Sequence, residues 1–388
     1  MTTRVRPVAT VLTLALLSLI PAAPAGTEPS PVIDQAGPAP SFRPAWGPVF
    51  NDPLGTVAEQ RRILAYLVRT IDAAPAGAVI RVAVYGFSDG PVARALHRAA
   101  DRGVRIRMVL DSSRRSKPAL GLQRRLGNNV RAASYVVFCN HSCRGTTGGN
   151  HTKFYLFSEA GGVADVTLVT SANTVGETVD NQWNDLFSVA GASPVYDSFA
   201  RVFEQMKHDE PVPRPYVEAH QASYLQGFYP APGAGRTAPD PWLDYLDPVR
   251  CTGAKRAGLG GHTRIRVAMS AMHGGRGLAG ARRLVALRRQ GCDVKVIFGA
   301  APGGEVRRVL TAGRVPWRGT RHRWVHTHQK LLIVNGVIGR DPWATRVFTG
   351  SHNWTDPAAD RDEVVLGIKG ARTARLYTQN WNYVWRRG

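Results

Sequence analysis

The stretch VHTHQKLLIVNG, residues 325–336, places a histidine and a lysine two positions apart at the start of a predicted strand. Strand side chains point to the same face at every second residue, so His328 and Lys330 are presented together. The apolar run over residues 331–334 is typical of a strand buried in a core. Burying an imidazole and an ammonium is costly unless they meet an anion or another polar partner. The rest of the sequence must therefore supply that partner.

The same pattern occurs upstream in GNHTKFYLFSEA, residues 149–160, which contains His151 and Lys153. Each copy follows a segment that begins with an apolar strand, continues as an amphipathic helix and ends with a second strand, at residues 79–111 and 264–299. Such β-α-β units build parallel or mixed sheets with covered faces. Because order, spacing and residue type all agree, the sequence predicts a duplication.

The predicted organisation has a first half at residues 49–210, a linker at 211–250 rich in Pro, Gly and aromatic residues, and a second half at 251–388. We expect a helix over residues 57–71, because Thr56 and Glu59 have the spacing of a capping box. Each half should end with a helix whose aromatic residues lie on one face.

The first 25 residues are predicted to be a signal peptide. Two arginines precede an apolar run at residues 8–20, and small residues follow, with cleavage expected after Ala25. The run is short for the alternative of a membrane anchor, and no other segment is long and apolar enough to cross a bilayer. We therefore expect a secreted, extracellular protein.

Four cysteines outside the cell indicate disulfides, and we expect Cys139 to pair with Cys143 and Cys251 with Cys292. A zinc site formed by Cys139, His141 and Cys143 is the alternative, but a second pair of ligands is missing.

The formal charge of +22 at pH 7 favours a polyanionic partner such as nucleic acid or an anionic lipid surface. The sign of the charge does not say which of them, and part of the arginine excess can reflect genome composition.

Each His-x-Lys pair is followed by Ser-x-Asn and then by a carboxylate. Two such sets meeting face to face would suit phosphodiester cleavage, because fixed cations and hydrogen-bond donors stabilise the charge of the transition state. One imidazole would attack phosphorus and the other would protonate the leaving oxygen. No metal or other cofactor is required. The candidate catalytic residues are His151, His328, Lys153, Lys330, Asp185 and Glu363, and the candidate phosphate-binding residues are Asn173, Asn353, Ser171 and Ser351.

These motifs resemble those of the phospholipase D superfamily, H-x-K-x4-D followed by G-S-x-N, which usually occur twice in one chain. The likeness covers about residues 49–387. It implies a duplicated α-β-α sandwich with two pseudo-symmetric halves and mixed sheets. It also implies that His151 is the nucleophile and His328 the general acid and base, and that Asp185 and Glu363 each orient a histidine across the interface between the halves.

The sequence departs from the family pattern at three positions. Ser158 and Asn335 stand where the motif has aspartate, and Thr170 replaces the glycine before Ser171. The family aspartate lies behind the lysine strand and is more structural than chemical, so the fold should be retained. A protein of this family that binds phosphate without catalysis is accordingly the third hypothesis.

The superfamily includes enzymes that act on lipids and on nucleic acids, so fold and motif leave the substrate open. Hydrolysis of phospholipid headgroups is the first hypothesis, because the protein is expected to be secreted and has aromatic residues suited to a membrane interface. Packing of those aromatics against the domains is the alternative. A metal-independent nuclease is the second hypothesis, supported by basic loops. A monomer is expected, because both motif copies lie on one chain. The aromatic residues are Tyr224, Phe228, Tyr229, Trp242 and Tyr245.

Overall fold

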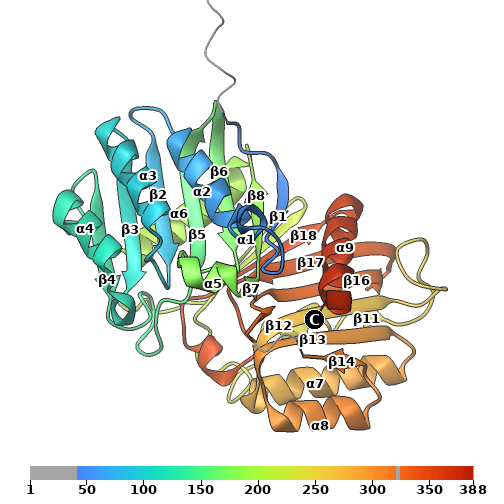
Figure 1. The fold of residues 1–388 in the computed structure, drawn as a ribbon. Coiled ribbons are helices and arrows are strands. Elements are labelled where there is room, and N and C mark those ends of the chain that lie inside the picture. Colours follow the sequence, from blue (N-terminus) through green and yellow to red (C-terminus); the bar gives the residue numbers. More distant parts are fainter. Residues whose placement is uncertain (1–41, 320–323, 388) are drawn as a thin grey trace, which may run out of the picture. The chain divides into compact units, whose positions relative to one another are not determined.

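The computed structural model describes residues 42–319 and 324–387, which belong to one compact unit, Ser41–Gly388 (Figure 1). The predicted signal peptide lies outside the described residues. No helix within the described part of the chain is long and apolar enough to span a bilayer.

The first half contains a seven-stranded mixed sheet in the order β1-β8-β6-β5-β2-β3-β4. Strands β2, β3 and β4 are parallel, and the others pair antiparallel. The strands are β1 (Gly47–Phe50), β2 (Val79–Val84), β3 (Arg105–Asp111), β4 (Tyr135–Cys139), β5 (Lys153–Ala160), β6 (Val163–Thr170) and β8 (Asp185–Val189). The helices are α1 (Val57–Gln60), α2 (Arg62–Asp72), α3 (Gly90–Asp101), α4 (Lys117–Leu126), α5 (Gly176–Asp180) and α6 (Ser193–Met206).

The second half repeats this arrangement in a nine-stranded sheet whose path is β14-β13-β12-β16-β17-β18-β10-β9, with β11 paired to β16. Its strands are β9 (Val217–Gln221), β10 (Tyr224–Phe228), β11 (Val249–Arg250), β12 (Arg264–Met272), β13 (Asp293–Pro302), β14 (Trp317–Arg318), β16 (Lys330–Ile338), β17 (Asp341–Gly350) and β18 (Val364–Lys369). Its helices are α7 (Gly274–Arg289), α8 (Gly304–Ala312) and α9 (Ala371–Arg387). The order β8-β6-β5-β2-β3 corresponds to β18-β17-β16-β12-β13, which confirms the predicted duplication.

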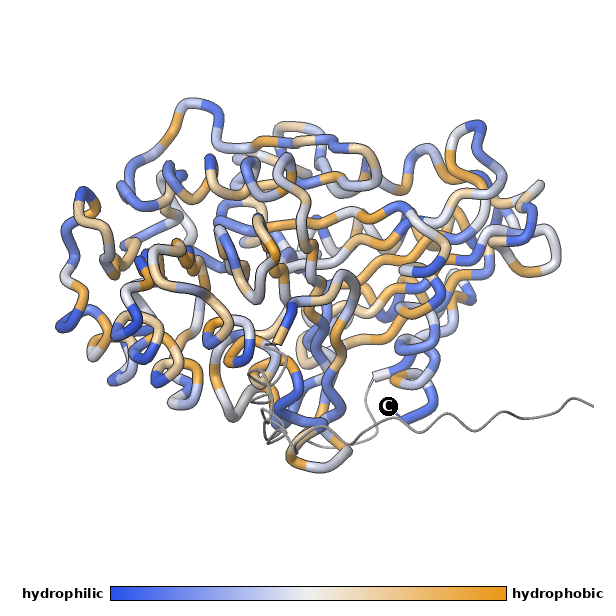
Figure 2. Tube along the Cα trace, turned by 90° about the horizontal axis from the view of Figure 1, so that it is seen from above, coloured by the Kyte–Doolittle hydropathy of each residue, from blue (hydrophilic) through white to orange (hydrophobic). Residues whose placement is uncertain are grey.

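Three hydrophobic cores hold the layers together, and the hydrophobic positions of the chain gather along the strands (Figure 2). One outer core lies under α2, α3 and α4, and the other lies under α7 and α8 (Figure 1). The central core contains residues of both halves, including Phe187 and Phe199 of the first and Leu366 and Trp381 of the second. The halves therefore share one apolar interface, which fixes the positions of the strand ends that bear the two motifs.

Two local expectations need correction or refinement. The helix expected over residues 57–71 is broken at Arg61 into α1 and α2, although the Thr56–Glu59 capping box is present. The segment expected to be a surface linker forms the β9–β10 hairpin, which pairs with β18 and widens the second sheet.

The aromatic residues of this segment are largely packed. Phe228, Tyr229 and Trp242 are each 1% exposed. They therefore contribute to the core rather than to a surface that could meet a membrane.

Candidate active site

The two His-x-Lys motifs occupy equivalent places in the two sheets. Lys153 begins β5 and pairs with Val84 of β2, while Lys330 begins β16 and pairs with Met269 of β12. Each ammonium donates a hydrogen bond to the carbonyl oxygen of its own motif histidine, at 2.7 Å for Lys153 Nζ and 2.6 Å for Lys330 Nζ. Both lysines are buried.

Each motif histidine is held by the backbone of the opposite half. The His151 N–H donates to the Asp362 carbonyl oxygen, and the His328 N–H donates to the Trp183 carbonyl oxygen, both at 2.9 Å. Short parallel pairings continue these contacts. Asn150 forms a bridge with Asp362, and β15 (His326–Thr327) pairs with β7 (Gln182–Trp183). The site is thus assembled across the interface between the halves.

The two imidazoles have different partners. His151 Nδ1 lies 2.8 Å from Glu363 Oε1, and His328 Nδ1 lies 3.1 Å from Asn184 Oδ1. The Asn184 amide is oriented by its NH₂ group, which donates to the Gln182 carbonyl oxygen at 3.1 Å. Its oxygen therefore faces His328, which assigns the donating proton to Nδ1 and leaves the other ring nitrogen, Nε2, as the one free to react.

We expected Asp185 beside His328, but the structure places Asn184 there. The Asp185 carboxylate accepts hydrogen bonds from Thr349 and, at 3.0 Å, from the Tyr377 hydroxyl. The reason is register. Asp185 N donates to Ser171 Oγ, as Val364 N donates to Ser351 Oγ, so Asn184 and not Asp185 is the equivalent of Glu363. A shift of one residue turns a strand side chain to the other face.

The serines of the Ser-x-Asn motifs orient the partners of the histidines. Ser351 Oγ donates to Glu363 Oε2, and Ser171 Oγ donates to Asn184 Oδ1 at 3.1 Å. We expected these hydroxyls to bind phosphate directly, but in the structure they lie one layer behind the imidazoles.

The asparagines of the same motifs are half-buried. Asn353 Oδ1 accepts a hydrogen bond from Ala271 N at 3.2 Å, which leaves its NH₂ group as a donor for a ligand. Asn173 Oδ1 is buried and has no hydrogen-bond partner among the described residues. These amides are therefore the groups of the Ser-x-Asn motifs that remain available to a substrate.

Burial and mutual repulsion set the protonation of the site. Burial, reinforced by Lys153 and Lys330, lowers the pKa of His151 and of His328 well below the usual value. Burial also lowers the pKa of Lys153 to about 7 and that of Lys330 well below its usual value. Burial raises the pKa of Glu363 to about 8. An anion placed among these groups would favour their protonated forms, so the site is suited to a phosphate.

Tyr85 adds an aromatic wall that sequence reasoning missed. Its ring centroid lies 5.0 Å from that of His151, and Lys153 Nζ lies 5.4 Å from the same ring. The Tyr85 hydroxyl accepts a hydrogen bond from Arg114 Nε at 2.8 Å. Its position directly after β2, one residue beyond the Val84–Lys153 pair, is the sequence feature that could have identified it.

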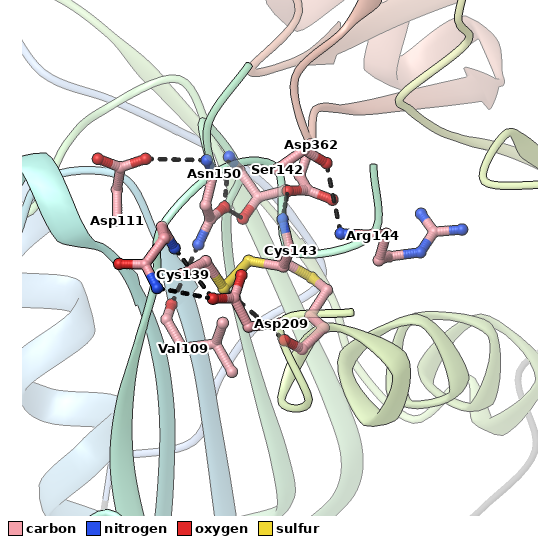
Figure 3. Close-up of a disulfide and its surroundings, with 12 residues drawn as sticks. Val109, Asp111, Cys139, Ser142, Cys143, Arg144, Asn150, Asp209 and Asp362 are labelled. Atoms are coloured by element: carbon pink, nitrogen blue, oxygen red, sulfur yellow. Dashed lines mark hydrogen bonds between the residues drawn. A yellow bond between two sulfur atoms is a disulfide. The ribbon is translucent and has the colours of Figure 1, made fainter. Parts of the chain in front are cut away.

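Both expected disulfides are present, and one of them supports the site (Figure 3). The N–H of Cys143, in the loop closed by Cys139–Cys143, donates to the buried carboxylate of Asp362. Burial raises the pKa of Asp362 to about 7. Because the Asp362 backbone holds His151 and Asp362 precedes Glu363, this loop is linked to the His151–Glu363 pair.

The two positions where the motif aspartate is replaced help to join neighbouring elements. Ser158 Oγ accepts a hydrogen bond from Val79 N at 2.9 Å. Asn335 donates through its NH₂ group to Thr378 of α9 at 3.3 Å.

Among the described residues, no group of three or more His, Cys, Asp and Glu side chains is arranged to hold a metal ion.

Comparison with known proteins identifies a matching family. The family model described as "Cardiolipin synthase, PLD-like domain" matches residues 67–207 and 260–385. A comparison with curated protein sequences finds no match.

Several solved structures share the fold. Phosphatidylserine synthase from Haemophilus influenzae matches with a TM-score of 0.57 and 13% identity, over 88% of this chain and 86% of that one. Polyphosphate kinase from Porphyromonas gingivalis matches with a TM-score of 0.54 and 13% identity, over 86% of this chain and 49% of that one, so this chain spans about half of its length. A mutant of yeast tyrosyl-DNA phosphodiesterase matches with a TM-score of 0.50 and 8% identity, over 83% and 89%. At these identities the likeness concerns the fold alone.

Proposed function

The chain belongs to the PLD-like domain family of cardiolipin synthases, and from this premise we propose that it is a secreted phosphodiesterase that hydrolyses the headgroup side of phospholipids. The observation that carries the proposal is the pairing of His151–Glu363 with His328–Asn184 around two buried lysines. This arrangement places the two imidazoles, each held at Nδ1, beside groups that can stabilise a phosphate, and a bound phosphate favours the protonated form of His328.

In the proposed reaction His151 Nε2 attacks phosphorus, and the bond between phosphorus and the headgroup oxygen breaks. His328, protonated in the substrate complex, donates its Nε2 proton to that oxygen, which leaves as the alcohol. Water then loses a proton to His328 and attacks the phosphohistidine, which releases His151 and the phosphate monoester. Lys153, Lys330 and the Asn173 and Asn353 amides stabilise the charge on the other phosphate oxygens. No proton is gained or lost overall by the two histidines.

Glu363 supports the assignment of His151 as the nucleophile. Attack by Nε2 places positive charge on the imidazole, and this charge favours the ionised form of Glu363, which accepts from Nδ1 and stabilises it. The amide oxygen of Asn184 carries no charge, so His328 is better suited to take up and release a proton.

A phospholipid is favoured by the expected secretion of the chain. The His151 side chain is only 9% exposed, so a substrate must bring its phosphate to a nearly buried imidazole. The two disulfides support an oxidising compartment. Both motif sets lie on one chain, which supports a monomer. The second candidate, a nuclease, is favoured by the charge of +22.

The test is the release of choline from phosphatidylcholine vesicles in EDTA. We expect release by the wild-type protein and none by His151→Ala or His328→Ala, with all three proteins folded by circular dichroism. Release that stops in EDTA, or that persists in both variants, would contradict the mechanism. Cleavage of single-stranded DNA without any headgroup release, falling steeply with salt, would establish the nuclease instead.

A further inference from the structure

A surface cavity of about 340 Å³ lies where the two halves meet, and it is lined by residues that closely precede His151 and Asp362 in the chain. A loop of the first half and the segment before β18 form its walls and are in close contact, since a Cβ at Gly148 would lie 2.2 Å from the Asp360 carbonyl oxygen. The residues that matter for its chemistry are Thr147, Gly148, Arg236, Asp356, Asp360 and Arg361.

The acidic side chains of this cavity are already paired. Asp360 accepts two hydrogen bonds of 2.9 Å from Arg236. Asp356 accepts from the backbone N–H groups of Gly275 at 3.0 Å and Arg276 at 2.8 Å. These carboxylates therefore have partners of their own and do not pair with the remaining cation of the cavity, Arg361.

Arg361 is half-buried, and its guanidinium makes no hydrogen bond or ion pair with any residue in the ranges 42–319 and 324–387. It lies directly before Asp362, whose carbonyl oxygen accepts from the His151 N–H at 2.9 Å, and two residues before Glu363. The Arg361 charge acts on the site electrostatically. Burial, Lys153 and Lys330 lower the pKa of His151 most, and Arg361 is the next largest cause.

We propose that this cavity binds a second anionic group of the substrate, carried by the headgroup, and that Arg361 is the residue that recognises it. The inference rests on the proposed function and narrows the substrate to phospholipids whose headgroup carries an anionic group. The carboxylate of phosphatidylserine is an example. A guanidinium suits a carboxylate or a phosphate because its planar fork can donate two parallel hydrogen bonds.

The geometry favours a headgroup over a nucleic-acid strand. A strand is held along a groove by repeated backbone contacts. Here Arg361 is the one guanidinium of the surface cavity that has no hydrogen-bond or ion-pair partner among the described residues, and the Lys153 side chain of the His-x-Lys motif is fully buried. One additional charge close to the scissile phosphate fits this arrangement.

The experiment uses vesicles that contain equal amounts of phosphatidylserine and phosphatidylcholine. Serine and choline release are measured from the same vesicles, so that attraction of this basic protein to the anionic surface affects both substrates equally. We expect the wild-type protein to favour serine, and Arg361→Gln to lower the ratio of serine to choline release about tenfold, the effect of losing one charged hydrogen bond.

Two further variants control for charge. Arg361→Lys retains the cation and should retain part of the preference. Arg307→Gln removes the same charge from an exposed position on α8 and should leave the ratio unchanged.

The outcomes separate this inference from the proposed function. Release of both headgroups with a ratio that Arg361→Gln does not change, or no preference in the wild-type protein, would refute the subsite and leave the phosphodiesterase standing. Absence of any headgroup release would refute both. If the wild-type protein instead cleaves single-stranded DNA and Arg361→Gln slows that reaction, the second group is a neighbouring phosphate and the assignment to lipid is overturned.

Discussion

The two disulfides should affect stability and activity in opposite order. We consider replacing both cysteines of one pair by serine, first Cys139 and Cys143, then Cys251 and Cys292. The sequence separations are 4 and 41 residues. The loss of loop-closure entropy in the unfolded chain corresponds to about 2 kcal/mol for the short loop and about 4 kcal/mol for the long one. The second variant should therefore have the lower melting temperature.

Activity should show the reverse order. The Cys143 N–H binds Asp362, whose other carboxylate oxygen is buried and has no partner among the described residues. If the loop loosens, Asp362 loses this contact, and the backbone that holds His151 and Glu363 is free to shift. Misplacement of a reacting group by about 1 Å can cost about a hundredfold in rate. We expect kcat to fall between tenfold and a hundredfold in the first variant.

The Cys251–Cys292 pair belongs to the outer core under α7 and α8, and Cys251 Sγ lies 3.2 Å from the Leu287 carbonyl oxygen. Its removal should leave kcat near the wild-type value at temperatures well below unfolding. Thermal unfolding and headgroup release at saturating substrate provide both readouts. Equal losses of kcat in the two variants, or a loss only in the Cys251–Cys292 variant, would refute a positioning role for the short loop.

Two further predictions concern protonation. Asn184→Asp gives His328 a carboxylate partner, which raises the pKa of His328 because the imidazolium is then stabilised at a distance of 3.1 Å. The limb of the kcat–pH profile that depends on His328 should move to higher pH by about one unit, and an unmoved limb would count against this pairing. Binding of dimethyl phosphate at about pH 8 should take up protons, because burial lowers the pKa of Lys153 to about 7 in the free protein and the anion raises it again. Calorimetry in buffers of different ionisation enthalpy measures this uptake; Lys153→Arg should lower it by the share of Lys153, and a binding enthalpy that is the same in every buffer would exclude it.

The duplicated fold was predictable because its evidence is local. Each β-α-β unit carries continuous apolar strands and one amphipathic helix, and these periodicities survive in both halves. The β9–β10 hairpin was not predictable in the same way. Its ladder partner is β18, which lies far along the chain, so its register depends on packing that no local pattern contains.

The candidate site was also predictable where its evidence is local and not where it depends on packing. The His-x-Lys pairs are visible within single strands, and the structure brings both to the interface. The partner of His328 was misassigned because the two halves differ by one residue in this region. Ser171 and Asn184 are 13 residues apart, whereas Ser351 and Glu363 are 12 apart. A search for an acidic residue equivalent to Glu363 finds Asp185. The hydrogen bonds of the motif serines show that the equivalent position is held by the neutral Asn184.

In the proposed mechanism, this difference gives the two similar halves separate chemical roles. The backbone contacts, the lysine hydrogen bonds and the serine supports are repeated, so geometry alone does not distinguish His151 from His328. Only His151 faces a carboxyl group, and the ionised form of Glu363 stabilises the imidazole that would become positive when its Nε2 bonds to phosphorus. A second carboxylate beside His328 would hold its proton more tightly and hinder transfer to the leaving alcohol. The neutral amide of Asn184 fixes the ring without that cost, which is why a duplicated site can divide attack and proton transfer between two otherwise equivalent histidines.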